Sequence, residues 1–391
     1  MVLTLANTGD TAIPNYSSLN AYDRLHLPKA APLTLSPEQV EKIRNVDSFD
    51  ELALLRRELL DPTPLRPLNR AGELAPFSIV VNLIHDNLIR QGVLLAVNDL
   101  AKRGLGTPPV PFAFLQFGSG GRSEQALISD QDNGLVYQLP DHLGEQETEK
   151  IHGYFQLLGA TIVAGLEVAG YPPCQGNVTC LSPKWRGSTE QWLDQIDRWV
   201  SHPIWENARY LLLASDVRVL WGESAIFTPV HDRFRQLLAG NVFLLNRLVS
   251  NTLHYRVPLG IFGRVLPEVH GRFRGAINVK YGIYLPLVNC VRHFALAHGI
   301  FASSTLERLD QLGEKGVWSK SFCDEVAAYF RQIQGLRLIA PLHWEDGQYT
   351  SNSYIKLGEL SPDTQVMVKQ SMKLAIRLQK MTEKLPSVFG G

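Results

Sequence analysis

Apolar residues recur at helical spacing in several stretches between residues 35 and 110. In residues 77–103 they fall three or four positions apart, a pattern that predicts one long helix. Upstream, Ser36-Pro37-Glu38 combines a capping residue, a first-turn proline and an acidic side chain, so we expect a helix to begin there. Short helices are predicted around residues 36–45 and 48–60, followed by a proline-rich break at residues 62–67.

The C-terminal part is also predicted to be helical. Residues 207–220 are apolar and are expected to form a helix, and from residue 224 onward the apolar period predicts helices almost throughout. Ser304 and Glu307 have the spacing of a capping box at the start of one of them. The expected helices span residues 230–239, 242–256, 283–298, 304–312, 321–339 and 362–384.

The pattern changes between residues 112 and 137. Residues 112–117 are a short apolar run that predicts a buried strand, and a glycine-rich turn at residues 118–121 then breaks it. Residues 122–126 can begin a helix, and residues 128–137 return as a second strand. After a predicted helix at residues 145–168, residues 170–181 are expected to add a further strand. This part of the chain therefore predicts a small sheet within a mostly helical protein.

Asp130 and Asp132 are the candidate catalytic residues. Side chains two positions apart on a strand point to the same side, and neighbouring carboxylates repel each other unless a cation lies between them. Such oxygen ligands suit Mg²⁺ (or Mn²⁺), which also binds substrate phosphates. For a lone pair of aspartates, a solvated acidic loop between a strand and a helix is the alternative explanation.

The glycine turn offers a phosphate site 12 residues upstream of this pair. Gly118 and Ser119 can present backbone N–H groups and a hydroxyl to a phosphate, and Arg122 adds a cation. Together with the paired carboxylates, these groups are the set that metal-assisted nucleotidyl transfer needs. Other glycine motifs are excluded, because Ser123 stands where a dinucleotide-binding motif needs glycine and no Gly-Lys-Ser/Thr occurs.

Composition narrows the choice of partners. The 391 residues contain 38 basic and 38 acidic side chains, so no basic excess predicts a nucleic-acid partner or an anionic membrane surface. The most apolar window, residues 157–169, is short and contains Glu167, so we expect no membrane span. The N-terminus has no signal-peptide pattern, and the four scattered cysteines are expected to be buried thiols, which predicts a cytoplasmic protein.

The string GSGGRSEQALISDQDNGLVY, residues 118–137, resembles the signature of the GlnD-like nucleotidyltransferases. These are similar to the N-terminal catalytic domain of the PII-protein uridylyltransferase, within the DNA polymerase β superfamily. Residues 278–296 and 304–312 are similar to the helical substrate-binding domain that accompanies such enzymes. The resemblance implies Asp130 and Asp132 as metal ligands, and an acid on the strand at residues 170–181. This sequence has Asn177, Val178 and Thr179 there instead.

The resemblance also implies roles for other polar residues. Glu124 or Gln125 would brace the loop, and Asn133 would hold Asp132 in place. Lys280, Arg292 and Arg308 lie within apolar helices, so they either pair with carboxylates of the core or face the triphosphate. The implied nucleotide-binding residues are Gly118, Ser119, Gly121, Arg122, Glu124, Gln125, Asn133, Lys280, Arg292 and Arg308.

Asp216 and Arg218 are a further candidate pair. Related sequences tend to have an acid, any residue and then arginine here, so these side chains would face the nucleotide or a second metal ion. An internal salt bridge on a buried helix is the alternative explanation.

The predicted fold is mostly helical α+β, with a small mixed sheet of the polymerase β type between an N-terminal helical segment and a C-terminal helical bundle. The expected divisions are an irregular arm at 1–34, helices at 35–110, the catalytic core at 111–200 and the substrate-binding domain at 201–391. The predicted activity is Mg²⁺-dependent transfer of NMP from NTP to an acceptor hydroxyl. By analogy, the acceptor would be a PII-like signalling protein. A catalytically degenerate nucleotide-binding module is the alternative function.

Overall fold

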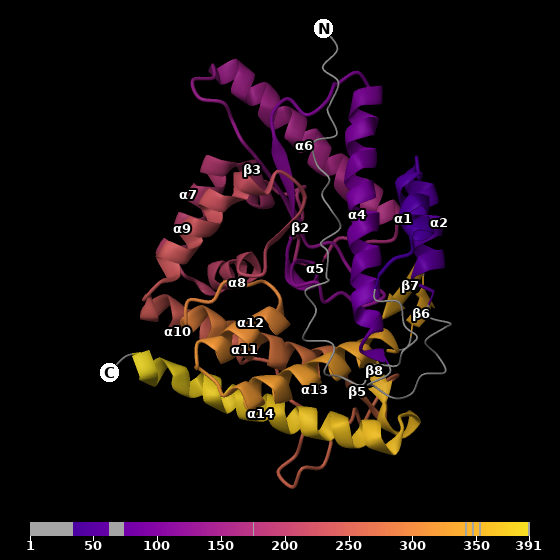
Figure 1. Cartoon of the computed structure of the whole chain (residues 1–391), viewed down its shortest axis with the longest axis vertical. Coiled ribbons are helices and arrows are strands. Elements are labelled where there is room, and N and C mark those ends of the chain that lie inside the picture. The colour runs from indigo at the N-terminus through magenta and orange to yellow at the C-terminus, as the bar shows by residue number, and fades with distance from the viewer. Residues whose placement is uncertain are drawn as a thin grey trace.

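The computed structural model describes residues 34–61, 74–174, 176–340, 342–345, 348–351 and 353–389. The predicted arm, apart from its last residue, and the proline-rich break at residues 62–67 lie outside these ranges. The described chain is a mostly helical α+β structure with a small sheet between two groups of helices (Figure 1). This confirms the predicted fold class.

The central sheet has four strands in the order β3-β2-β1-β4. β1 (Phe112–Gln116) and β2 (Asn133–Tyr137) pair antiparallel, as the two apolar runs predict, and all of their residues are buried. β3 (Arg186–Ser188) runs parallel to β2, and β4 (Arg218–Gly222) runs antiparallel to β1. The sheet is therefore mixed, and it includes a strand beyond residue 200, where the sequence predicts the core to end.

Alternate residues of β1 face two different hydrophobic clusters, as the period of a strand requires. Phe112 and Phe114 pack with α4 (Phe77–Lys102) and α6 (Glu145–Val168). Ala113 and Leu115 face the other way, into a second cluster in which several further helices take part, three of them close to the sheet in the chain. These are α7 (Thr189–Ser201), α8 (Trp205–Ala214) and α9 (Thr228–Leu238).

Two short helices complete the N-terminal side. α1 (Pro37–Arg44) begins at the capping box of Ser36, and it packs on α4 together with α2 (Phe49–Leu59). By length and composition, α6 could cross a membrane. However, its residues Phe155, Leu158 and Ile162 are completely buried in the cluster beside the sheet. Packing against the sheet therefore accounts for the apolar stripe of this helix.

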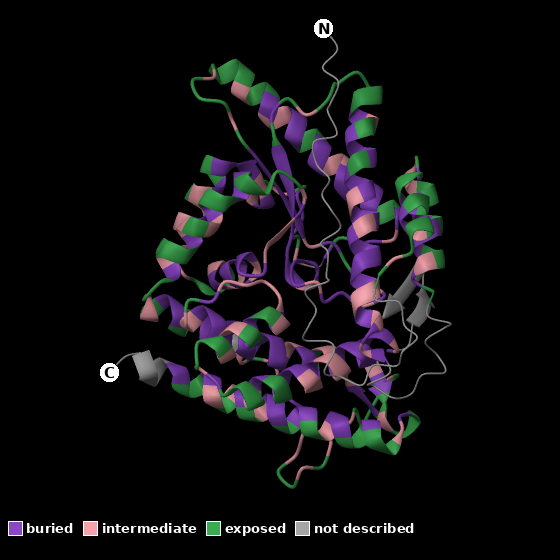
Figure 2. Ribbon diagram, in the orientation of Figure 1, coloured by how far each residue is buried: buried purple, intermediate pink, exposed green. Residues whose placement is uncertain are grey.

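The C-terminal helices form a second layer, below the sheet in Figure 1. Figure 2 shows that buried residues concentrate where the helices meet one another and the sheet. The six helices predicted after residue 224 are all present, α9 among them. The other five are α10 (Val242–Thr252), α11 (Leu285–Ala297), α12 (Thr305–Glu314), α13 (Lys320–Leu338) and α14 (Pro362–Phe389).

The prediction of an almost wholly helical C-terminal part missed four short strands. β5 (Ala276–Asn278) pairs with β8 (Tyr354–Lys356), and β6 (Leu342–Glu345) pairs with β7 (Gln348–Ser351). Strands of three or four residues are too short to establish an alternating pattern. A π-helical turn, Lys280–Tyr284, leads from β5 into α11.

Three local predictions around the sheet are wrong. The helical turn after β1 is α5 (Gly118–Gly121) itself, and the helix expected at residues 122–126 does not form, since Ser123 adopts a positive φ of 56°. Residues 170–181 contribute only an isolated bridge between Gln131 and Pro173 among the described residues. The helix expected at residues 207–220 ends at Ala214, and its last residues belong to β4.

Two buried histidines make the fold sensitive to acid. The His85 ring lies 2.9 Å from the Tyr171 hydroxyl and 2.8 Å from the Ala126 carbonyl. Burial, helped by the charge of Arg56, lowers the pKa of His85 to about 3. Burial likewise lowers the pKa of His293 to about 4. In the unfolded chain both would titrate near 6.5.

The unfolding free energy is therefore expected to fall as the pH drops below about 6.5, because only the unfolded chain then takes up these protons. Each histidine contributes at most about 1.4 kcal/mol per pH unit. Urea denaturation between pH 7.5 and 5 would measure the slope. His85→Gln should reduce the slope, whereas His142→Gln, at an exposed position, should not. Equal slopes in both variants would contradict the assignment.

Candidate active site

The side chains around the acidic pair point alternately to two sides of the segment. Gln131 donates to the carbonyls of Val163 and Tyr171 at 3.0 and 2.7 Å, on the buried side. Asn133 accepts from the Cys180 N–H at 2.9 Å, and it donates to Gln131 at 3.1 Å. The two amides thus fix residues 130–133 against the loop at 171–180.

Asp132 points to the opposite side, toward the glycine turn. A Cβ placed on Gly118 would lie 2.5 Å from Oδ2 of Asp132, and Gly118 has a positive φ of 54°. Both observations demand glycine at this position. The Phe117 N–H also donates to the Asp132 carbonyl at 2.9 Å. The start of α5 and the Asp132 carboxylate are therefore in direct contact.

Electrostatics set Asp132 apart from an ordinary surface acid. Burial and then the repulsion of Asp130 raise the pKa of Asp132 to about 6, whereas Cys174, Lys280 and Arg122 act in the opposite direction. Asp130 itself is exposed. A carboxylate under this repulsion gains from a cation placed beside the pair.

A narrow pocket brings these groups together. Asp130 and Asp132 line it with Gly120 of the turn and Gln116 at the end of β1. Lys280 reaches the same region from the C-terminal layer. Burial lowers the pKa of Lys280, and Asp130 and Asp132 are the carboxylates that oppose this. Lys280 is therefore close enough to Asp130 and Asp132 for their charges to act on it.

The acidic pair suits a divalent ion that takes only some of its ligands from the protein. The described residues hold no group of three His, Cys, Asp or Glu side chains arranged for a metal ion. Mg²⁺ usually takes one or two carboxylates and completes its shell with water and substrate phosphates. Asp130 and Asp132 supply two carboxylates beside a helical turn whose first N–H groups have no intrahelical acceptor.

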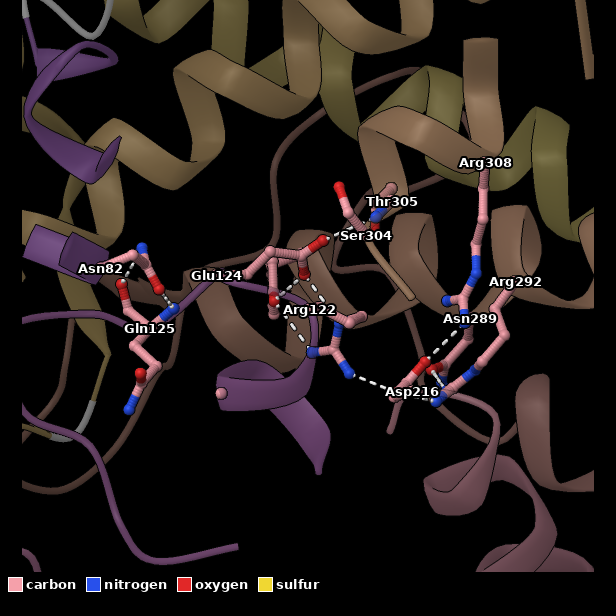
Figure 3. A network of polar contacts seen from close by, with 12 residues as sticks. Asn82, Arg122, Glu124, Gln125, Asp216, Asn289, Arg292, Ser304, Thr305 and Arg308 are labelled. Atoms are coloured by element: carbon pink, nitrogen blue, oxygen red, sulfur yellow. Dashed lines mark hydrogen bonds and ion pairs between the residues drawn. The ribbon is translucent and has the colours of Figure 1, made fainter. Parts of the chain in front are cut away.

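The sequence predicts that Arg122 contacts a phosphate, but its side chain lies within a network of protein groups (Figure 3). Its guanidinium is buried and donates to Glu124 at 2.7 Å, to Asp216 at 2.5 Å and to the Tyr284 hydroxyl at 3.0 Å. Its three nitrogen atoms therefore all bind protein groups. This arrangement links the end of the glycine turn to the C-terminal helices, because Tyr284 belongs to the π-helical turn before α11.

Asp216, the candidate ligand for a second metal ion, is the centre of the same network. Its side chain is completely buried on the turn between α8 and β4. It binds Arg122, Arg292 at 2.6 Å and Arg308 at 2.9 Å. Burial alone would raise the pKa of Asp216, but Arg292, Arg122 and Arg308 hold it below its usual range. Three arginines occupy this carboxylate, so we leave Asp216 out of the metal site.

For Arg292 and Arg308, the sequence left open whether they pair with carboxylates of the core or face the triphosphate. Both side chains pair with a core carboxylate, that of Asp216. Arg308 is completely buried and also donates to the Ser215 and Ala302 carbonyls at 2.8 and 2.7 Å. Arg292 additionally binds Asn289. Both side chains are buried, and they join the C-terminal helices to the turn between α8 and β4.

Glu124 and Gln125 brace the segment after the turn. The Glu124 carboxylate accepts from the Tyr284 hydroxyl at 2.5 Å and from the Thr305 N–H, at the start of α12, at 3.0 Å. The Gln125 N–H donates to the Asn82 side chain at 2.7 Å. Figure 3 shows both connections leaving the chain on either side of Arg122. Ser119 is partly exposed on the turn, and Gly121 packs against the Asp216 backbone.

Arg218, predicted to face the nucleotide or a second metal ion, instead binds groups of the protein, and some contacts of the site were not predicted at all. Arg218 forms a two-pronged pair with Asp86, at 2.7 and 2.8 Å, and also donates to the Gly120 carbonyl at 2.9 Å. Asp86 on the apolar helix α4 was a signal, since a buried acid needs a partner. No pattern in the sequence marks Cys174 or Tyr284.

Two parts of the chain match known protein families. Residues 68–206 match the family described as "Putative nucleotidyltransferase DUF294". Residues 243–385 match the one described as "Putative nucleotidyltransferase substrate binding domain". A comparison with curated proteins found no match. Two successive parts of the chain thus match a putative nucleotidyltransferase domain and a putative nucleotidyltransferase substrate-binding domain.

Proposed function

We propose that this protein transfers a nucleoside monophosphate from an NTP to an acceptor hydroxyl, with Mg²⁺ or Mn²⁺ bound at Asp130 and Asp132. The observation that carries the proposal is the direct contact between the Asp132 carboxylate and the backbone of Gly118. This contact brings a metal-binding side chain next to a turn suited to phosphate. The family match supports nucleotidyl transfer as the general reaction.

In this proposal each part of the site has one task. A bound metal ion would neutralise charge on the phosphates as pyrophosphate leaves. Gly118 and Ser119 would hold the β- and γ-phosphates through backbone N–H groups and the Ser119 hydroxyl. Lys280 would contact the triphosphate from the other side of the site, as a point charge. Asn133 would keep the acidic segment in place.

The proposal extends to the nucleotide base and the acceptor only by analogy. The resemblance to the PII-protein uridylyltransferase suggests UTP and a tyrosine hydroxyl on a PII-like signalling protein, in the cytoplasm. This step rests on analogy, since related folds carry different activities.

A nucleotide-binding module without catalysis is the second candidate. It is favoured by one observation: Asp216 is occupied by arginines, so only two carboxylates remain for metal in the described site. Calorimetry with each NTP and Mg²⁺, beside a transfer assay with α-labelled NTP and candidate acceptor proteins, separates the two functions. Labelled acceptor supports the enzyme, and tight binding without label supports the module.

Gly118→Ala is expected to reduce transfer at least about 100-fold, because a misplacement of about 1 Å near the reacting groups has effects of this size. The new methyl group would meet Asp132 at 2.5 Å, at a backbone angle that alanine avoids. Gly120→Ala is the matched control, since its Cβ would meet only the Gln116 side-chain amide at 3.2 Å. Steady-state rates of both variants would test this. Equal losses would contradict a special role for Gly118.

A further inference from the structure

A hairpin in the C-terminal layer carries two large apolar side chains at its tip. Ile261 is 98% exposed and Phe262 is 96% exposed, the highest values among the large apolar residues described as exposed. The hairpin is the loop that projects beyond α14 at the bottom of Figure 1. Exposed apolar side chains are common singly, but two adjacent ones at the most prominent point of a surface indicate a contact site.

The tip is an ordered turn. The Gly263 N–H donates to the Gly260 carbonyl at 2.9 Å, and the Gly260 N–H donates to the Arg264 carbonyl at 2.8 Å. Ile261 and Phe262 thus occupy the two corners of a hydrogen-bonded turn, and Gly263 follows with a φ of 68°. Turn corners favour Pro, Asn, Asp, Ser or Gly, so turn formation does not explain the two apolar residues.

The base of the hairpin is fixed to the domain. Val257 is buried in the C-terminal cluster, and Leu259 and Val265 pack against that cluster while forming an antiparallel bridge. Pro258 fits against Gly282, where a Cβ would approach the proline ring to 2.8 Å. The tip is therefore held in a defined position, as a contact element requires.

Positive charge surrounds the apolar tip. The Lys369 and Lys373 side chains of α14 lie beside Gly263, and Arg264 follows it in the turn. Among the residues that the structure describes, none of these three cations has an ion-pair partner. The hairpin is thus an apolar projection with a basic rim, and it fits an apolar recess with an acidic rim.

A recess of this kind lies on the same domain. A groove of about 540 Å³ runs between α13 and α14, with Tyr329, Val366 and Met367 in its apolar part. Glu325 and Asp363 are exposed at the groove and have no ion pair within the described parts of the chain. No basic side chain lines the groove. Its apolar lining and acidic side chains are complementary to the apolar tip and basic rim of the hairpin.

The hairpin and the groove both lie against α14, on different rows of its side chains. Lys369 and Lys373 mark the row next to the hairpin, and Val366 and Gln370 mark the row next to the groove. Both rows have one-turn spacing and are offset by three residues, so they occupy neighbouring faces of α14.

We propose that the chain forms a two-fold symmetric dimer, in which the Ile261–Phe262 tip of each protomer inserts into the α13–α14 groove of its partner. A two-fold axis repeats every contact, and a projection beside a recess on one surface is the arrangement such an axis needs. One turn alone buries too little surface for a stable interface of about 800 Å² per protomer. In the proposed dimer, two insertions and the α14 faces between them would together supply the buried area.

Sedimentation equilibrium of the full chain tests the proposal. The wild type is expected to be dimeric at micromolar concentrations, and the double variant I261D/F262D to dissociate at least about 100-fold more readily, because two central apolar anchors are lost. Val366→Asp, in the exposed wall of the groove, should have the same effect. Leu54→Asp is the control, since Leu54 is 61% exposed on α2, far from both elements in the chain. All three should keep the helix content of the wild type by circular dichroism, whereas only the two interface variants should lose the stability that association adds.

Mixing the variants gives the decisive result. A protomer with a damaged tip and one with a damaged groove still share one intact insertion. The mixture is therefore expected to form heterodimers more readily than either variant forms homodimers. A monomeric wild type at 100 µM, or a dimer that survives both substitutions, would overturn the proposal. A wild type that stays monomeric but binds anionic vesicles through the tip would overturn it in favour of a lipid surface.

Discussion

Asp132→Asn is expected to lower the rate of NMP transfer at least about 1,000-fold, because metal ions at such sites contribute several kcal/mol and each factor of ten corresponds to about 1.4 kcal/mol. The asparagine keeps the shape beside Gly118 but removes the charge that would bind the metal ion. Transfer of α-labelled NMP at saturating NTP and Mg²⁺ would measure the effect. Unchanged turnover would eliminate the proposed role of this residue.

The unfolding free energy of the Asp132→Asn variant is a second, independent measurement. Burial and Asp130 raise the pKa of Asp132 to about 6, above its value near 3.9 in an unfolded chain. At pH 7 the charged carboxylate therefore disfavours the folded state, and removing it should leave the unfolding free energy unchanged or increased. Asp141→Asn, at an exposed position outside the site, is the matched control and should retain full activity. A destabilised Asp132→Asn variant would show that its activity loss has a structural cause.

Asp216→Asn is expected to lower the unfolding free energy by about 3–5 kcal/mol, the usual cost of removing one partner from a buried ion pair. The substitution would leave the guanidiniums of Arg122, Arg292 and Arg308 without the carboxylate that they share. Denaturation in urea at pH 7 would measure the loss. Because the network joins the glycine turn to the C-terminal helices, the affinity for NTP is expected to fall as well.

An exposed ion pair provides the control for this prediction. Asp197 binds Arg233 at 2.8 Å, but both side chains are about 40% exposed. Asp197→Asn should therefore cost less than about 1 kcal/mol, since water already solvates and screens the pair. Similar costs at the two positions would contradict the view that burial makes the Asp216 network important for stability.

The sequence by itself determined the parts of the fold that depend on local pattern. The strands at residues 112–116 and 133–137 follow from short apolar runs, and the helices α4 and α6 follow from apolar residues at helical spacing. The acidic pair was also readable, because its spacing and the glycines upstream are local features. The strands β3 and β4 were not, since three to five residues acquire strand structure only from a neighbour in the sheet.

The tertiary structure decided which charged residues belong to the site. Arg122 lies four positions from Gly118 in the sequence, yet Asp216 and Tyr284, distant along the chain, turn it away from the glycine turn. Lys280 joins the acids for the same kind of reason. A buried charge must find its partner wherever the packed elements bring one. Local spacing predicts which groups are available, and only the packing of the two domains assigns their partners.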